Sequence, residues 1–529
     1  MGPEANINSI RALEKQIVEG EGDVIKLKRS RNLLLNISTR VPPEILGHIF
    51  CRNIVRETDY SLNSPSLFAG LQKGSYNFLL VCHHWFEVAS RTPALWSFWG
   101  TTFQQWKKRH HRSAAIPLDL VLEGSRADPG VPFDESLQVA VRGRAMQDTI
   151  RRVHLLSYHP GILTSIISLL TPNDEGGRNE NIESIVWYNV TRSYVDASNF
   201  FARSRLSRLR FIKLCGTIQV SSLDRLALQT RLLTTLSLTL EGSIAAPTLT
   251  APQLFSILTS NPDLRELCLS GTALPDDADG STFKVPLHNL KMLFLRGDLR
   301  RVLGLLRHLI LPDTLDEIIL DLFNLMAGDI PQILGPYIRD YFQRNPRYQD
   351  RLEIDSHSSL GQASISVVNN GSKFPYVTLV IEGPPLVMKK SLTKLIAFTP
   401  VEYVRSFHVG MATNLPEKIF SMMPNIEMLH LRCVQLSEGF LQPNPNGSRA
   451  NTKLLPSLRL LRLEDVKFQN DEDWDHLAKY LDHQTSDEQP ISLEVIGRFP
   501  YTPPDVVDRI KDLVKEFTYR RNAQAEEDE

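Results

Sequence analysis

Cys82, His83 and His84 are the densest group of metal-ligating residue types in the chain. Consecutive residues on a helix point roughly 100° apart, so one tetrahedral ion could not take all three as ligands. The sequence has no second Cys/His cluster at zinc spacing. Asp277-Ala278-Asp279-Gly280 is similar to part of a calcium loop, but the bidentate glutamate needed downstream is absent. We therefore expect no metal and no cofactor.

The run Lys107-Lys108-Arg109-His110-His111-Arg112 is the one dense basic patch. It fits a nuclear-import signal, a phosphate contact or an exposed helix face between two domains. The chain has 59 Lys and Arg against 60 Asp and Glu, so no global field would draw it to nucleic acid or an anionic membrane. One possible function, of a different class from those considered below, is a nucleic-acid regulator that uses the basic run. Phosphate-binding, nucleophile-elbow and zinc-protease motifs are absent, so we expect no enzyme.

Two short amphipathic helices are predicted between Val41 and Trp96. The first starts at the prolines of the sequence VPPEILGHIF, because proline suits the first turn of a helix. The second ends at Thr92-Pro93, because the residue before a proline avoids the α region. A loop-like insertion, Cys51 to Tyr76, separates them. The apolar positions of the helices and of the segment that follows are Ile45, Leu46, Ile49, Phe50, Phe78, Val81, Cys82, Trp85, Val88, Ala89, Leu95, Trp96, Phe98 and Trp99.

The order V-P-P-E-I-L-x-x-I-F, L-x-V-C-x-x-W-x-x-V-A and T-P-x-L-W resembles the F-box, especially the version common in mushroom-forming fungi. The resemblance implies that these helices bind a Skp-type adaptor and so join a cullin complex as the substrate receptor of a ubiquitin ligase. Two departures are Val41, where the family usually has leucine, and the long insertion. The residues implied in adaptor binding or in the F-box core are Val41, Pro42, Pro43, Ile45, Leu46, Ile49, Phe50, Leu80, Val81, Cys82, Trp85, Val88, Leu95 and Trp96.

The first 36 residues carry an imperfect heptad pattern of apolar residues. It predicts a helix from Asn8 to Val18, a break at Glu19 to Gly22 and a second helix from about Asp23. The segment fits self-association, a partner helix or packing against the F-box region. We place the F-box-like domain at residues 37–112, with its insertion at 51–76.

The pattern L-x-x-L-x-L recurs through residues 113–500. Clear copies begin at Leu264, Leu290, Ile426 and Leu458, and weaker ones at Ile150, Ile182, Leu209, Leu233, Leu315 and Val404. From Ile150 to Leu315 the starts are 32, 27, 24, 31, 26 and 25 residues apart, which is typical of leucine-rich repeats. Helical segments such as Pro252 to Ser260 and Leu415 to Met423 lie between them. The sequence therefore predicts an α/β fold, a curved solenoid with a parallel sheet on its concave face and helices on its convex face.

Residues 321–400 interrupt the repeat. Leu352 to Ile354, Ala363 to Val368 and Tyr376 to Ile381 read as strands, the last two joined by a hairpin at Asn369 to Ser372. They fit an insertion or divergent repeats. A capping helix is expected within residues 501–521, from Pro504 to Arg521, before an acidic tail at 522–529. The polar strand positions expected on the concave face, where a protein target would bind, are Arg265, Glu266, Cys268, Glu427, His430, Arg459 and Arg462.

Five scattered cysteines without a C-x-x-C pair fit reduced thiols in a cytoplasmic or nuclear protein. The N-terminus does not read as a signal peptide, and the longest apolar stretches are too short to span a membrane. The leading functional hypothesis is a non-catalytic substrate receptor that binds a Skp adaptor and a protein target. The alternative is a repeat scaffold that does not engage a ligase.

Overall fold

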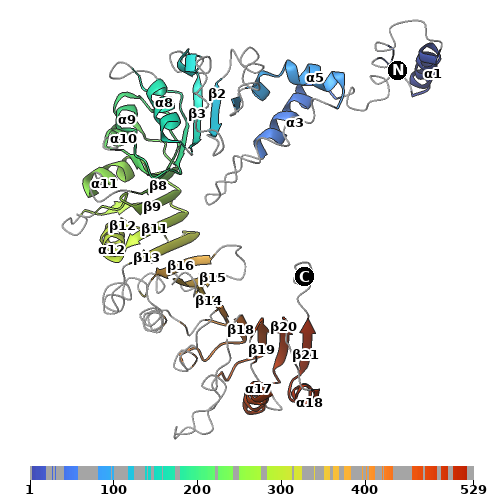
Figure 1. The fold of residues 1–529 in the computed structure, drawn as a ribbon, viewed down its shortest axis with the longest axis vertical. Helices are drawn as coiled ribbons and strands as arrows, with labels where there is room; N and C mark the ends of the chain where they lie inside the picture. Colours follow the sequence, from blue (N-terminus) through green and yellow to red (C-terminus); the bar gives the residue numbers. More distant parts are fainter. Residues whose placement is uncertain are drawn as a thin grey trace. The chain divides into compact units, whose positions relative to one another are not determined.

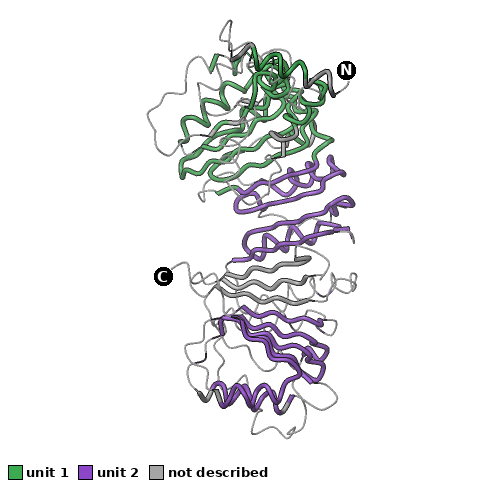
Figure 2. The backbone as a smooth tube through the Cα atoms, turned by 90° about the vertical axis from the view of Figure 1, so that its right-hand side faces the viewer, with its two compact units in different colours: residues 1–233, 240–247 green, residues 234–239, 248–529 purple. Residues whose placement is uncertain are grey.

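The computed structural model divides into two compact units, residues 1–233 with 240–247 and residues 234–239 with 248–529 (Figures 1 and 2). It describes residues 3–18, 41–56, 81–96, 98–99, 117–123, 138–143, 148–172, 179–241, 249–275, 283–323, 351–357, 362–368, 375–382, 404–410, 422–432, 455–484, 490–497 and 504–520, together with residues 27, 30, 339, 396, 401 and 420; positions 140, 158, 221–223, 313–314, 467 and 469–470 are excepted. Each unit is described by itself.

Among the described residues before the first strand there are four helical elements: α1 (Pro3–Val18), α3 (Pro43–Arg56), α5 (His83–Ser90) and the 3-10 helix η3 (Pro93–Trp96). Helix α1 ends where predicted but begins five residues before Asn8, because Pro3 suits a first turn. Helix α3 begins at Pro43 as expected. It continues to Arg56, so the first six residues of the predicted loop, which contain no Gly or Pro, are helical instead.

All ten copies of the L-x-x-L-x-L pattern form strands. In nine of them the opening apolar residue is buried and the strand begins two residues later; in the copy at Ile150 the strand begins at once. The strands are β3 (Ile150–Ser157), β4 (Ser184–Asn189), β6 (Phe211–Gly216), β8 (Thr235–Leu240), β9 (Glu266–Gly271), β11 (Met292–Asp298), β13 (Glu317–Phe323), β17 (Ser406–Gly410), β18 (Met428–Arg432) and β19 (Leu460–Glu464).

In unit 1, β1 (Phe98–Trp99), β2 (Leu118–Glu123), β3, β4 and β6 pair in that order, all parallel. Strand β1 precedes β2, so the two aromatic residues Phe98 and Trp99, expected in the helical region, form a strand. The short strands β5 (Val195–Asp196) and β7 (Ile218–Gln219) pair with each other. The helices that follow the longer strands are α8 (Pro160–Leu170), α9 (Ser198–Arg203) and α10 (Asp224–Gln229).

His154 on β3 gives unit 1 a dependence on pH. Its side chain is buried, with Nε2 2.8 Å from Ser184 Oγ. Burial, and then the charge of Arg152, lower the pKa of His154 from 6.5 to about 3. The unfolded chain binds a proton below about pH 6.5 while the folded chain stays neutral, so stability falls as pH drops from 6.5 toward 3, by about 1.4 kcal/mol per pH unit. Urea denaturation at pH 7 and pH 5 should show a smaller loss for His154→Gln than for wild type; equal losses would contradict this.

In unit 2, strands β9, β11 and β13 are followed in space by β16 (Pro375–Glu382), β15 (Gln362–Val368) and β14 (Arg351–His357). Beyond β14 come β17, β18, β19, β20 (Ser492–Ile496) and β21 (Glu516–Arg520). Of these strands β15 alone runs antiparallel to its neighbours. The three strands predicted between residues 352 and 381 are thus confirmed, and they form an antiparallel meander within an otherwise parallel sheet.

The helices that the structure describes in unit 2 are α11 (Ala251–Ser260), α12 (Leu299–His308), α17 (Asp471–Gln484) and α18 (Pro504–Leu513). Helix α11 confirms the predicted segment, and Thr250 caps it in a capping box with Gln253. Helix α17 begins at the acidic run Asp471 to Asp475, because carboxylates are favourable near the positive end of the helix dipole. The short strands β10 (Val285–Pro286) and β12 (Leu309–Ile310) pair with each other in parallel.

One backbone contact recurs from strand to strand in unit 2. The residue after the opening apolar residue offers its carbonyl oxygen to two amide groups of the next repeat. Arg265 O accepts from Lys291 N at 2.7 Å and Met292 N at 3.0 Å, and Glu427 O accepts from Arg459 N and Leu460 N at the same two distances. The contact sets the register of each new strand independently of side-chain identity.

The capping helix predicted up to Arg521 is wrong after Leu513. Residues 514 and 515 form a bend, and β21 then pairs in parallel with β20. Phe517, Thr518 and Tyr519 explain the difference, because aromatic and β-branched residues favour strands. The described chain therefore ends in one more helix and strand.

Several predictions lie outside the described residues. They are the remainder of the insertion (57–76) with Leu80, the break at 19–22, the basic run 107–112, the loop at 277–280, the turn at 369–372, most of the helix 415–423, Cys433 and the tail 522–529. Cys51, Cys82, Cys215 and Cys268 are thiols and form no disulfide. Among the described helices, none has the length and apolar character needed to cross a membrane.

Candidate functional site

Residues 41–56 and 81–96, here called the helical module, have a small apolar core. Helix α3 contributes Leu46 and Phe50, and its partners approach from α5 and η3. Phe50 lies against Trp85, with ring centroids 5.1 Å apart and an angle of 58° between the planes. Val41, Cys51 and Trp85 pack at the margin of this core, whose buried members are Leu46, Phe50, Val88, Ala89, Leu95 and Trp96.

Three polar contacts fix α5 and η3. The backbone of Cys82 is extended and its Sγ accepts from Trp85 N at 3.5 Å, so Cys82 caps α5. The helix therefore starts at His83, and the prediction that placed Val81 and Cys82 within it is wrong. At the other end, Thr92 Oγ1 donates to Val88 O and Trp96 Nε1 donates to Ala89 O, both at 2.7 Å. These bonds hold the Thr92-Pro93 turn that was predicted to end the helix.

Four large apolar side chains of the module are exposed: Ile45 (52%), Ile49 (44%), Val81 (56%) and Phe86 (41%). We call them the exposed apolar residues. Ile45 and Ile49 are one helical turn apart and so are neighbours on the surface of α3. Their sequence neighbours Leu46 and Phe50 are buried, so the apolar residues of α3 lie on two faces, one buried and one exposed. Burying such a side chain fully contributes about 1.5–3 kcal/mol.

The predicted adaptor residues that the structure describes thus separate into three groups. Phe86 is exposed too, but it was not among the residues predicted to bind the adaptor. It lies off the helical face that Cys82, Trp85 and Ala89 share. A large aromatic residue away from the apolar face is the feature of the sequence that could have indicated it. Leu46, Phe50, Val88, Leu95 and Trp96 are core, Val41, Cys82 and Trp85 are partly buried, and Pro42, Pro43, Ile45, Ile49 and Val81 are exposed.

The residues predicted to bind a target also separate. Glu266, His430 and Arg462 occupy strand positions that alternate with buried residues, so they lie on the polar face of the sheet of unit 2. Arg265, Glu427 and Arg459 do not, because each strand begins one residue after them. Cys268 shares the alternation of Glu266 but is buried.

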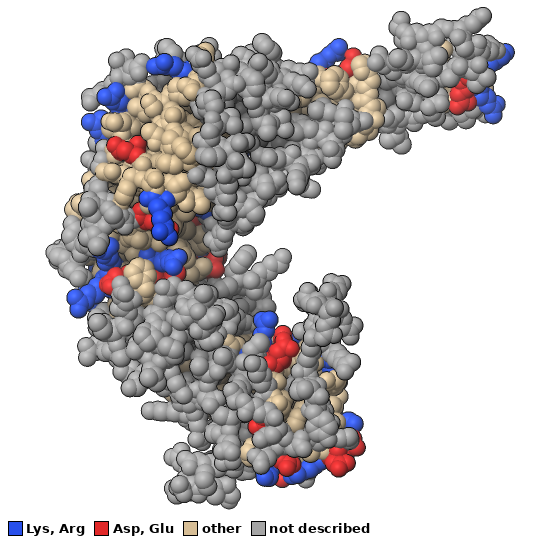
Figure 3. All heavy atoms as spheres, in the orientation of Figure 1, with Lys and Arg blue, Asp and Glu red and all other residues tan. Residues whose placement is uncertain are grey.

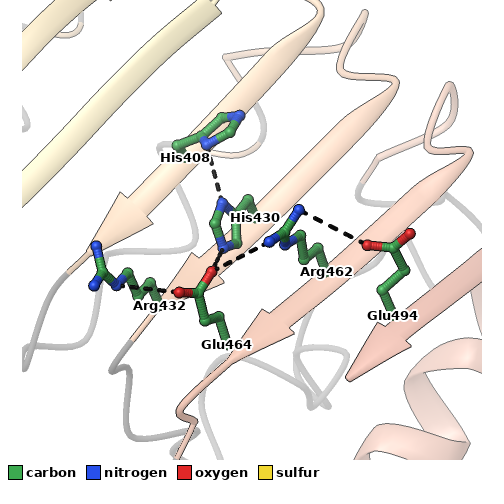
Figure 4. A network of polar contacts seen from close by, with 6 residues as sticks. All are labelled: His408, His430, Arg432, Arg462, Glu464 and Glu494. Carbon is green, nitrogen blue, oxygen red and sulfur yellow. Dashed lines mark hydrogen bonds and ion pairs between the residues drawn. The ribbon is translucent and has the colours of Figure 1, made fainter. Parts of the chain in front are cut away.

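His430 and Arg462 belong to a polar network across β17 to β20 (Figure 4). The Nδ1 atoms of His408 and His430 are 3.0 Å apart, and His430 Nε2 is 3.0 Å from Glu464 Oε2. Glu464 also forms ion pairs with Arg432 and Arg462, both at 3.5 Å. Arg462 reaches Glu494 at 3.9 Å. His430 and Glu464 are 14% and 19% exposed, which weakens screening by solvent.

One feature of the sequence indicates this network. His408, His430 and Arg462 occupy the same position of consecutive repeats, between the last two apolar residues of L-x-x-L-x-L. The strand register confirms that His408, His430, Arg462 and Glu494 form one row. Arg432 and Glu464 form the next row.

The described surface carries both signs of charge. Figure 3 shows Lys and Arg interspersed with Asp and Glu over unit 2. The two arginines and two glutamates of the network balance each other. Within the described ranges, no group of three or more His, Cys, Asp or Glu is placed to hold a metal ion. The arrangement is suited to recognition by hydrogen bonds and ion pairs.

Neither a scan against models of protein families nor a search of curated proteins found a match to this chain.

Proposed function

We propose that the helical module is an F-box that binds a Skp-type adaptor, and that the chain is a non-catalytic substrate receptor of a cullin-based ubiquitin ligase. The exposure of Ile45 and Ile49 beside a complete core is the observation that carries the proposal. A module this small gains little stability from its own core, so apolar side chains left in water mark a surface for a partner.

The strand repeats supply the second half of this proposed function. Recurring strands, each opened by a buried apolar residue and registered by the same carbonyl contact, support a leucine-rich-repeat solenoid. The polar face of its strands would present Glu266, His430 and Arg462 to a protein target. Catalysis would reside in other subunits of the ligase, and this chain would contribute proximity and orientation.

Co-purification with a Skp-type adaptor tests the first half. The double variant Ile45→Asp/Ile49→Asp places two charges on the exposed side of α3 and leaves the core of the module unchanged. We expect at least a hundredfold weaker adaptor binding, since losing about 3 kcal/mol corresponds to roughly that factor. The matched control is Ile310→Asp, because Ile310 is 46% exposed, close to Ile49 at 44%, and lies on β12.

The wild type and Ile310→Asp should recover equal amounts of adaptor. If the double variant recovers as much adaptor as the wild type, Ile45 and Ile49 do not lie in the adaptor interface. Failure of the wild type to bind adaptor, with a repeat-dependent partner retained, would instead support the alternative: an interaction scaffold without ligase engagement. Val41 and the separation of α3 from α5 motivate that alternative.

A further inference from the structure

The hydrogen bonds of His408 and His430 fix where their protons lie. An ionised carboxylate accepts hydrogen bonds but cannot donate them, so the contact with Glu464 places a proton on His430 Nε2. Neutral His430 then presents an unprotonated Nδ1 to His408, whose own Nδ1 must donate across the 3.0 Å contact. The two imidazoles are therefore opposite tautomers.

A first added proton fits this arrangement. It can bind to His408 Nε2, or leave His430 doubly protonated with His408 as the acceptor, and in both cases one proton remains between the two Nδ1 atoms. A second added proton puts a proton on each Nδ1, and the two N–H groups then point at each other. The contact must open, which separates the side chains of β17 and β18.

We propose that His408 and His430 form one proton-binding unit, which keeps β17, β18 and β19 joined through their side chains while it carries up to one added proton and opens when it takes a second. The unit is a pH-sensitive switch on the polar face of the sheet. It requires neither the adaptor nor a target, so it stands apart from the proposed function.

The charged groups around His408 and His430 do not change the limit of one added proton for the closed contact. Glu464 on β19 favours added protons, whereas Arg432 on β18 and Arg462 on β19 oppose them, and Glu494 on β20 contacts Arg462. None of these groups lets both Nδ1 atoms carry a proton while they are 3.0 Å apart.

The acid limb of the switch follows from proton counting. In an open state the two histidines are separate and each binds a proton near pH 6.5, so the pair binds two. The closed state binds one. The equilibrium between the closed and the open contact of His408 with His430 should therefore shift toward open by about tenfold for each pH unit below about pH 6.

Two measurements on the full-length protein with a metal chelator present test this. Imidazole 15N chemical shifts, assigned with His408→Gln and His430→Gln, should show a proton on Nδ1 of His408 and on Nε2 of His430 at pH 7.5. The same 15N shifts, followed from pH 7 to pH 4.5, should show that the pair takes its second added proton only as the contact between the two Nδ1 atoms is lost. In His408→Gln and in His430→Gln the remaining histidine should titrate as a single group, while His288→Gln, at an exposed position, should leave the coupled titration unchanged.

The same tautomer for both imidazoles, or independent protonation of both near pH 6.5, would overturn the proposal. A wild-type pH dependence in both variants would also overturn it, because the opening would then belong to other groups.

Discussion

The Gly216→Ala variant is expected to lose about 4 kcal/mol or more of its free energy of unfolding. Gly216 ends β6 with φ of +93°, a backbone conformation that side chains with a Cβ rarely adopt. A Cβ atom there would lie 1.9 Å from the carbonyl oxygen of Asn189 on β4. The new methyl group cannot be accommodated by moving a side chain, because the atom that it meets belongs to the backbone and the backbone of residue 216 is itself strained by the Cβ. The two strands must therefore separate locally.

The surroundings of Asn189 increase the cost of that separation. Its Nδ2 donates to Ser193 O at 2.8 Å, Thr217 O at 3.0 Å and Thr217 Oγ1 at 2.9 Å. The side chain is buried, so bonds broken by a shift of β6 are not replaced by water. The loss should appear in urea denaturation followed by circular dichroism.

Gly143→Ala is the matched control. Gly143 is helical and exposed, and a Cβ there meets nothing within 4 Å. An alanine in an exposed helical position should stabilise the protein by about 0.5–1 kcal/mol. If both glycine variants are as stable as the wild type, the close approach of β4 and β6 at Gly216 is wrong.

The Phe50→Ala variant should destabilise the helical module by about 3–5 kcal/mol, the usual cost of removing a buried aromatic ring. Phe50 is 1% exposed and lies at the centre of the module, between Leu46 and Trp85. A core of this size cannot absorb such a loss, so the module should unfold while the strand repeats stay folded. Limited proteolysis with mass spectrometry should show new cleavage within residues 41–96.

Ile49→Ala separates the core from the surface. Ile49 directly precedes Phe50 on α3 but is 44% exposed, so its truncation should change the stability of the module by less than about 1 kcal/mol. Similar cleavage of the two variants would show that α3 does not divide into a buried and an exposed side.

The strands could be predicted from the sequence because their signal is local. An aliphatic residue, followed three and five positions later by two further apolar residues, determines which side chains are buried, and these three positions are buried in every copy. The start of α5 could not be predicted in the same way. Cys82 continues the apolar period of the helix, yet its sulfur serves as the N-cap, and the pattern cannot distinguish these two roles.

The polar network escaped prediction for a different reason. His408, His430 and Glu464 are brought together by the register of three strands, across 22 and 34 residues of chain. A shift of one residue in any strand would move a side chain to the other face. The shared repeat position of His408, His430 and Arg462 indicates that they form one row, whereas the contact of Glu464 with that row depends on the pairing of β18 with β19, which the repeat pattern alone does not determine.

The antiparallel meander of β14 to β16 has a consequence for how unit 2 folds. In repeat arrays, order spreads from each strand to the next one along the chain. Here the spatial neighbour of β13 is β16, the third strand to be synthesised after it, and β17 pairs with β14. Propagation from β13 must therefore wait until β14, β15 and β16 have assembled together. We expect two cooperative folding segments in unit 2, β9 to β13 and β17 to β21, which become coupled when the meander closes.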